Sequence, residues 1–173
     1  MASRRRMFRP AGFIIAGLMM ILPFISVSCD VPGGYGRAAP GGTTKYNGVA
    51  LIVGGEPEVD PPDKLREGDS ARLPPQPLAI LTLLFLIAGV VITLRINDTL
   101  VRRAIVALLS GVTGICLVAN QITVQSQLHE RVAPRYVHNQ PGFWLCLAVL
   151  VIVMFANAIG WLRSAPRSDD EGG

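Results

Sequence analysis

The sequence predicts an all-α membrane protein with four transmembrane helices and one extracytoplasmic loop segment. Half of the 173 residues are hydrophobic, only 6% are aromatic, and the mean hydropathy is +0.44. This composition is atypical of a soluble domain. Four runs are apolar enough, and nearly or fully long enough, to cross a hydrocarbon core of about 30 Å, which takes about 20 helical residues. Backbone groups cannot stay unpaired in lipid, so each run should be α-helical.

The four runs divide the chain into nine segments. Transmembrane helices are expected over 11–28, 78–94, 104–124 and 143–162. The remaining segments are a basic N-terminus over 1–10, extracytoplasmic loops over 29–77 and 125–142, a cytoplasmic turn over 95–103, and a tail over 163–173.

Arginine placement sets the expected orientation. Arginines are densest beside three of the predicted span ends: Arg4, Arg5, Arg6 and Arg9, then Arg95, Arg102 and Arg103, then Arg163 and Arg167. Basic residues near span ends favour the cytoplasmic side, which places both termini there. The net charge of +4 is therefore explained by membrane orientation rather than by nucleic acid. We expect a multi-pass protein of the cytoplasmic (plasma) membrane whose surroundings are the lipid bilayer.

Local patterns predict two helix starts. Asn97, Asp98 or Thr99 is expected to cap the helix over 104–124, because their side-chain oxygens accept its first N–H groups. Pro141 suits the first position of the last helix, where a missing N–H costs nothing.

Cys29 follows directly on the first apolar run and has two interpretations. A basic start, an apolar segment and Ser28 are typical of a lipoprotein signal that is cleaved before a lipid-modified cysteine. Against this, the run over 11–28 exceeds the usual 7–15 residues of a signal segment, Ser26 stands where Leu is usual, and Pro23 interrupts the run. The uncleaved helix is the favoured interpretation, with lipidation at Cys29 as the alternative.

The outer segment contains one apolar piece and one polar piece. The stretch over 43–53 resembles a β-hairpin turning at Asn47-Gly48; a single short strand, or a loop on the membrane interface, is the alternative. The stretch over 56–76 is rich in Pro and charge and is expected to be an extended linker. Neither is large enough for a core of its own.

No enzymatic chemistry is expected, and no cofactor or metal. The four spans contain no Asp, Glu, Lys, Arg or His, which argues against proton relays and ion pathways. Asn120 and Gln121 are expected to bond to neighbouring helices rather than to a substrate. The three cysteines form no C-x-x-C pair, His129 and His138 have no metal-ligand spacing, and no phosphate loop or nucleophile elbow occurs.

Small residues recur at four-residue spacing within the spans, as in Ala107/Gly111 and Ser110/Gly114. Such pairs let helix backbones approach closely. They are consistent with packing inside a four-helix bundle, and also with docking of a partner's helix.

The stretches "LPFISVSC" and "TKYNGVALIVGG", together with the span layout, resemble a group of small multi-pass membrane proteins of high-GC Gram-positive bacteria. The resemblance implies a four-span topology and supplies no mechanism.

The expected function is therefore non-enzymatic: an accessory or scaffold subunit of a membrane complex, in contact with a membrane-protein partner or with further copies of itself. The alternative is a small transporter or channel component for an uncharged or lipid-like molecule. The residues predicted to contact a partner are the apolar side chains of the outer segment, namely Tyr46, Val49, Leu51 and Ile52.

Overall fold

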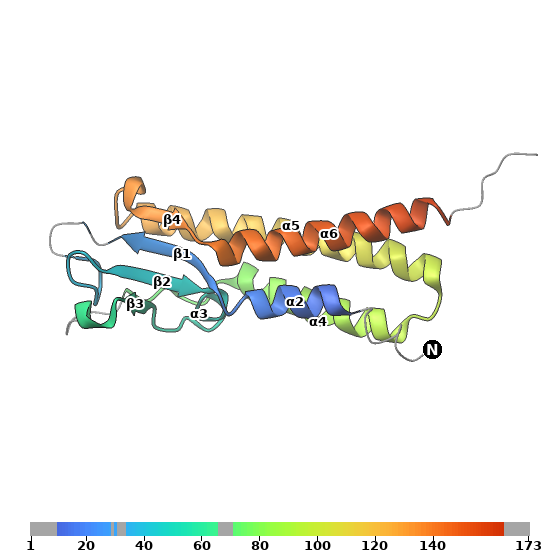
Figure 1. The fold of residues 1–173 in the computed structure, drawn as a ribbon, viewed down its shortest axis with the longest axis horizontal. Helices are drawn as coiled ribbons and strands as arrows, with labels where there is room; N and C mark the ends of the chain where they lie inside the picture. The colour runs from blue at the N-terminus through green and yellow to red at the C-terminus, as the bar shows by residue number, and fades with distance from the viewer. Residues whose placement is uncertain (1–9, 29, 31–33, 66–70, 165–173) are drawn as a thin grey trace, which may run out of the picture.

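The computed structural model describes residues 10–28, 30, 34–65 and 71–164. Its longest elements are three helices, α4 (Pro77–Arg95), α5 (Thr99–His129) and α6 (Pro141–Leu162). They lie along the long axis of the molecule, and the strands gather at one end (Figure 1). We call that end the sheet end and the opposite one, where residues 96–98 join α4 to α5, the turn end.

These three helices are long and apolar enough to cross a membrane, which supports the expected membrane location. They contain 19, 31 and 22 residues. At 1.5 Å per residue, α5 is about 46 Å long and exceeds a hydrocarbon core of about 30 Å. Helix α5 therefore extends beyond the predicted helix over 104–124 at both ends, and its residues 125–129 belong to the predicted loop over 125–142.

The expected helix over 11–28 is wrong in its second half. Only α2 (Ala11–Met19) is helical, and Pro23–Ser28 forms strand β1. Pro23 lacks an N–H and disfavours helix continuation, while Ile25 and Val27 are β-branched and favour a strand. Nine helical residues reach only about 13 Å, so α2 alone does not span a bilayer.

The outer loops combine into an antiparallel sheet, which an all-α class did not predict. Its strand order is β3-β2-β1-β4, with β2 (Thr43–Asn47), β3 (Glu58–Asp60) and β4 (Val137–Asn139) around β1. Ile25 and Val27 of β1 pair with β2 on one side and with β4 on the other. The two predicted loops, over 29–77 and 125–142, are thus parts of one structure.

The expected hairpin at Asn47-Gly48 is also wrong. The chain leaves β2 at Asn47 and forms helix α3 (Gly48–Val53), and the Asn47 side chain accepts a hydrogen bond from the Ala50 N–H at 2.7 Å. Asparagine is a strong helix N-cap as well as a turn residue. The alternative of a single short strand describes Thr43–Asn47 correctly.

The polar stretch over 56–76 is not simply an extended linker among its described residues. It supplies β3 and a short 3₁₀ helix, η1 (Pro62–Lys64). The Glu56 carboxylate binds the Arg72 guanidinium at 2.7 Å, and Leu73 is buried. A second short 3₁₀ helix, η2 (Pro134–Tyr136), precedes β4.

Both predicted helix starts are confirmed. The Asp98 carboxylate accepts hydrogen bonds from the Leu100 N–H at 2.8 Å and the Val101 N–H at 3.2 Å, and so caps α5. Pro141 opens α6.

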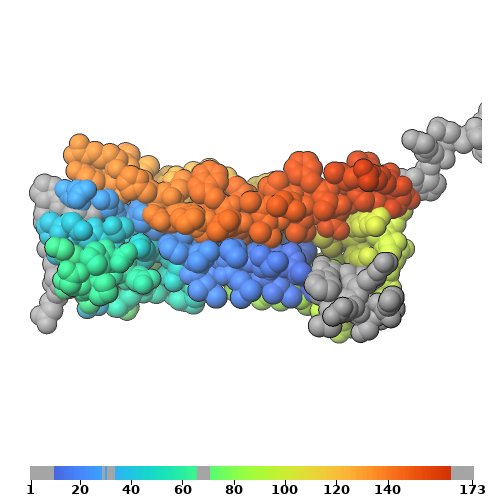
Figure 2. Space-filling view, in the orientation of Figure 1, coloured from blue at the N-terminus to red at the C-terminus, as the bar shows by residue number. Residues whose placement is uncertain are grey.

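One apolar core unites the sheet with the helices. It runs from Phe13 in α2 through Ile25 in β1 and Tyr46 in β2 to Leu150 in α6. The space-filling view accordingly shows the strands and helices as one continuous body (Figure 2). The outer segment therefore has no separate core, as its size predicted.

Candidate functional site: an apolar groove between α5 and α6

The side chains predicted to contact a partner divide into two groups. Tyr46 and Leu51 are buried in the chain's own core, at 1% and 0% exposure. The Tyr46 hydroxyl also donates a hydrogen bond to the Ala71 carbonyl. Ile52 packs against the core, and only Val49 is substantially exposed. Tyr46 and Leu51 are therefore not exposed for contact with a partner in this structure, because this segment packs into the chain's own core at the sheet end.

Amide side chains join the helices to the sheet. The Gln121 Nε2 donates to the Asn139 Oδ1 at 2.7 Å, and the Gln125 Nε2 donates to the same oxygen at 2.6 Å. The Gln140 Nε2 donates to the Ser26 hydroxyl at 2.6 Å. These bonds link α5 and β1 to the β4–α6 connection, so Gln121 has a structural role. The Oδ1 of Asn120 is buried and accepts no hydrogen bond from the described residues.

The cysteines and histidines show no catalytic arrangement within the described residues. Cys29, the candidate for lipidation, lies outside them. The buried Cys146 donates from Sγ to the Ala16 carbonyl at 3.5 Å, and Cys116 is half-buried. His129 and His138 are both exposed.

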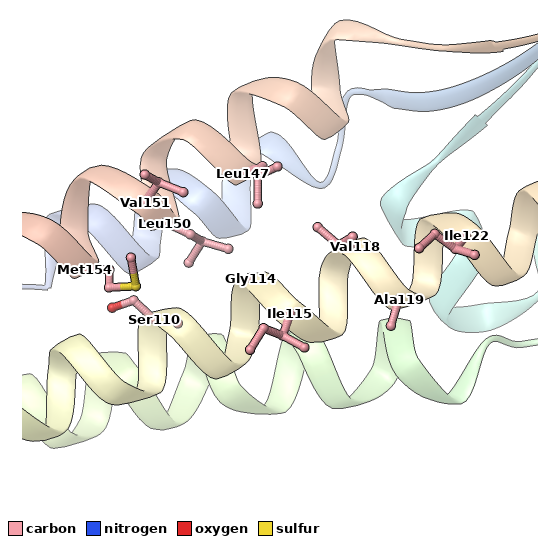
Figure 3. Close-up of a pocket in the computed structure, with 11 residues that line it drawn as sticks. Ser110, Gly114, Ile115, Val118, Ala119, Ile122, Leu147, Leu150, Val151 and Met154 are labelled. Carbon is pink, nitrogen blue, oxygen red and sulfur yellow. The ribbon is translucent and has the colours of Figure 1, made fainter.

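An apolar groove lies between the helices α5 and α6, on their outward surface. It encloses about 540 Å³. Its floor on α5 includes Gly111 and Gly114, and Leu147, Leu150 and Met154 extend toward it from α6 (Figure 3). The remaining lining residues are Ser110, Ile115, Val118, Ala119, Ile122 and Val151.

The groove continues toward the turn end. A second hollow of about 490 Å³ shares Gly111, Ile115 and Met154 with the first and extends it to Ala104 and Trp161. We call the two together the α5–α6 groove. From 104 to 122 it follows α5 for about 27 Å, close to the full thickness of a hydrocarbon core of about 30 Å.

Two other glycines of the bundle, Gly12 and Gly89, are required by the chain's own packing. A Cβ at Gly89 of α4 would lie 2.6 Å from the Phe13 ring, and one at Gly12 would lie 2.3 Å from Val153 Cγ2. At Gly114 the nearest atom, Leu147 Cδ1, would be 3.8 Å away, which is an ordinary contact. Gly114 is thus not needed for the chain to pack on itself.

The groove offers shape and apolar surface but no reactive group. Its only hydroxyl, on Ser110, is buried and donates to the Val106 carbonyl one turn earlier. Three large side chains on its α5 edge are strongly exposed: Leu108 at 71%, Ile115 at 70% and Ile122 at 59%. In water such a surface would be unfavourable, so it faces lipid or another helix.

Comparison with family models, with curated proteins and with solved structures found no match. The resemblance to small membrane proteins of high-GC Gram-positive bacteria therefore stays a prediction.

Sequence reasoning identified the small residues of the groove but not the groove itself. The pairs Ala107/Gly111 and Ser110/Gly114 indicated a site of close helix approach. A glycine inside a helix costs about 1 kcal/mol relative to alanine, so its presence there suggests a packing requirement. Which faces of α5 and α6 point outward depends on how the helices pack, and no local pattern encodes that.

Proposed function

We propose that the protein is a non-enzymatic accessory subunit of a membrane complex, and that its α5–α6 groove holds a membrane-spanning helix of a partner protein. The groove replaces the outer segment as the expected contact surface, because Tyr46 and Leu51 are occupied within the chain.

The observation that carries this proposal is the contrast between the glycines. Gly12 and Gly89 are explained by Val153 and Phe13, whereas a Cβ at Gly114 would have only Leu147 Cδ1 nearby, at 3.8 Å, and this glycine lines the α5–α6 groove. Helices in membranes associate where small residues let backbones approach closely. A partner helix supplies the reason for a glycine at this position.

The length of the groove favours a helix over a single lipid chain. An acyl chain belongs to one leaflet and reaches only the middle of the bilayer, about 15 Å from either side. The groove extends about 27 Å along α5, which matches an object that crosses both leaflets.

The chemistry of the groove favours a structural partner over ion transport. It is lined by apolar side chains and one internally bonded serine. Ion-coupled transport requires ionisable or polar groups along a pathway. The runner-up function, movement of an uncharged or lipid-like molecule, is favoured only by the fact that this apolar groove is open to its surroundings.

The proposed orientation follows the arginines. The turn end carries Arg95, Arg102 and Arg103, so it is the cytoplasmic end, and the sheet lies outside the cytoplasmic membrane. Chain direction then places the start of α2 and the end of α6 nearer the cytoplasm than the sheet, with both termini there. This orientation requires a fourth crossing of the membrane before β1, by the segment that contains α2, and that crossing is part of the proposal.

The experiment fills the groove without disturbing the bundle. Gly114→Leu places an isobutyl group in the hollow, and Gly17→Leu is the matched control, because a Cβ there has no atom within 4 Å. Both variants are expressed in the native membrane, purified with mild detergent and analysed by mass spectrometry for co-purifying proteins.

We expect Gly114→Leu to reduce the yield of a specific membrane partner about tenfold, while Gly17→Leu retains it. Equal partner recovery with both variants would contradict the proposed helix site. Loss of a tightly bound lipid or other small molecule, with no change in protein partners, would instead favour the runner-up function.

A further inference from the structure

A second pocket, of different character, lies at the turn end between α2, α4, α5 and α6. It encloses about 280 Å³. Its apolar lining includes Phe13 and Ile152, and its polar lining comprises Thr93, Arg102, Arg103 and Asn157. Small-molecule pockets usually hold about 300–1,000 Å³, so this one suits a compact polar group.

Arg103 is held in place by the end of α6. Its Nη1 donates to the Gly160 carbonyl at 2.7 Å and to the Ser164 hydroxyl at 2.5 Å. A Cβ at Gly160 would lie 3.2 Å from the Arg103 Nε, so the guanidinium lies directly over this glycine. The side chain is therefore oriented before any ligand arrives.

The other edge of the same guanidinium has no acceptor among the described residues. Both hydrogen bonds use Nη1, which leaves the N–H groups of Nε and Nη2 available. The ion pairs within the described ranges all lie at the sheet end, where Glu56 binds Arg37 and Arg72, and Asp60 binds Lys45. Arg103 has none of these carboxylates as a partner.

The charge and shape of this edge define the ligand. Nε and Nη2 of arginine form a planar fork that matches two oxygens of a phosphate or carboxylate. At the border of a membrane, outside bulk water, such a charge-assisted pair is stronger than at a fully exposed site. The first turn of α2, with Phe13, closes the apolar side of the pocket.

We propose that this pocket binds a phosphate-bearing anion, with Arg103 as the principal binding residue. Its volume takes a headgroup rather than acyl chains, so the phosphate belongs either to an anionic phospholipid of the adjacent leaflet or to a soluble phosphate compound. The site does not depend on the α5–α6 groove and goes beyond the proposed accessory function.

The test measures binding to the purified full chain after exchange into a lipid-free detergent. Native mass spectrometry counts bound molecules across a concentration series of phosphatidylglycerol, with phosphatidylcholine as the uncharged comparison. A parallel series adds inorganic phosphate as competitor. Arg103→Gln removes the fork, and Arg163→Gln is the matched control, since it removes an equal charge from an exposed residue at the same end.

We expect one phosphatidylglycerol to bind at least tenfold more tightly than phosphatidylcholine, and Arg103→Gln to lose this preference while Arg163→Gln keeps it. Displacement by millimolar inorganic phosphate would identify a soluble phosphate as the source, and its absence a lipid. Equal losses in both variants, or no preference in the unmodified chain, would overturn the proposal.

Two milder variants keep the test decisive if Arg103→Gln does not fold. Arg103→Lys retains the charge but not the fork, and Ser164→Ala removes one bond that orients the guanidinium. Each should weaken phosphatidylglycerol binding several-fold, and unchanged binding in both would also overturn the proposal.

Discussion

Phe13 of α2 packs against Gly89 of α4, and a Cβ at that glycine would be 2.6 Å from the ring. This contact, with Gly12 against Val153, seats the short helix α2 between α4 and α6. At Gly114 in the α5–α6 groove, by contrast, the nearest atom to a Cβ would be Leu147 Cδ1 at 3.8 Å. At Gly12 and Gly89 the space that a side chain would take is filled from the opposite helix.

Gly89→Ala should therefore destabilise the protein. The added methyl forces Phe13 to move within a packed interior, which typically costs about 1–3 kcal/mol. Gly17→Ala is the control, because its Cβ enters open space and helix propensity improves. Thermal unfolding in detergent should show a lower midpoint for Gly89→Ala only; equal midpoints would mean that α2 is not seated as described.

The amide junction makes a second prediction. Asn139→Ala removes the oxygen that accepts hydrogen bonds from Gln121 and Gln125, and Gln121 is only 3% exposed. The Gln121 Nε2 would keep only a long hydrogen bond of 3.5 Å to the Phe24 carbonyl, and a buried donor that is poorly satisfied costs up to about 1–3 kcal/mol. His138→Ala changes the exposed neighbour and should alter stability by less than about 0.5 kcal/mol.

Amide hydrogen exchange in β4 reports on this junction directly. Exchange should accelerate in Asn139→Ala and stay unchanged in His138→Ala. If both variants exchange at the native rate, the amide bonds do not hold the sheet to the helices.

Strand β1 makes a prediction about processing at Cys29. Cleavage before that residue would remove α2 and the whole of β1, which lies between β2 and β4. Phe24, Ile25 and Val27 would be lost from the core, where their exposure is 1%, 0% and 0%. At about 1.5–3 kcal/mol per side chain, the loss approaches the entire stability of a domain, about 5–15 kcal/mol.

Intact mass measurement of protein from native membranes should therefore find the residues before Cys29 still attached. Metabolic fatty-acid labelling that disappears in Cys29→Ser, together with a mass lacking the first 28 residues, would contradict this expectation.

The sheet also constrains topology. Glu58 in β3 and His138 in β4 belong to one sheet and must lie on the same side of the membrane. In a cysteine-free background, single cysteines at these exposed positions should react with an impermeant maleimide in intact cells. A cysteine at Asn97, beside the arginines of the turn, should not react. Labelling at Asn97, or at only one of the sheet positions, would refute the proposed orientation.

The elements that were predicted correctly have local causes. The three long helices follow from continuous apolar runs, the start of α5 from the capping side chain of Asp98, and the start of α6 from Pro141. Each of these signals acts within a few residues of its own position, so no knowledge of the rest of the fold is needed.

The elements that were missed depend on distant partners. Strand β1 is part of a long apolar run, and its strand conformation requires pairing with β4, more than a hundred residues later. Asn47 is compatible with a hairpin turn and with a helix cap, and the packing of Leu51 decides between them. The groove likewise depends on how α6 packs beside Gly111 and Gly114 of α5.

Site-specific photocrosslinking at Ile115 tests the central claim most directly. Ile115 lies on the edge of the α5–α6 groove and is 70% exposed. A photoreactive amino acid is introduced at this position. The control position is Ile87 on α4, which is 52% exposed but does not line the groove. After irradiation of native membranes, Ile115 should yield one discrete crosslinked protein band that Ile87 does not. Crosslinks from both positions to lipid alone would contradict a groove that holds a partner's helix.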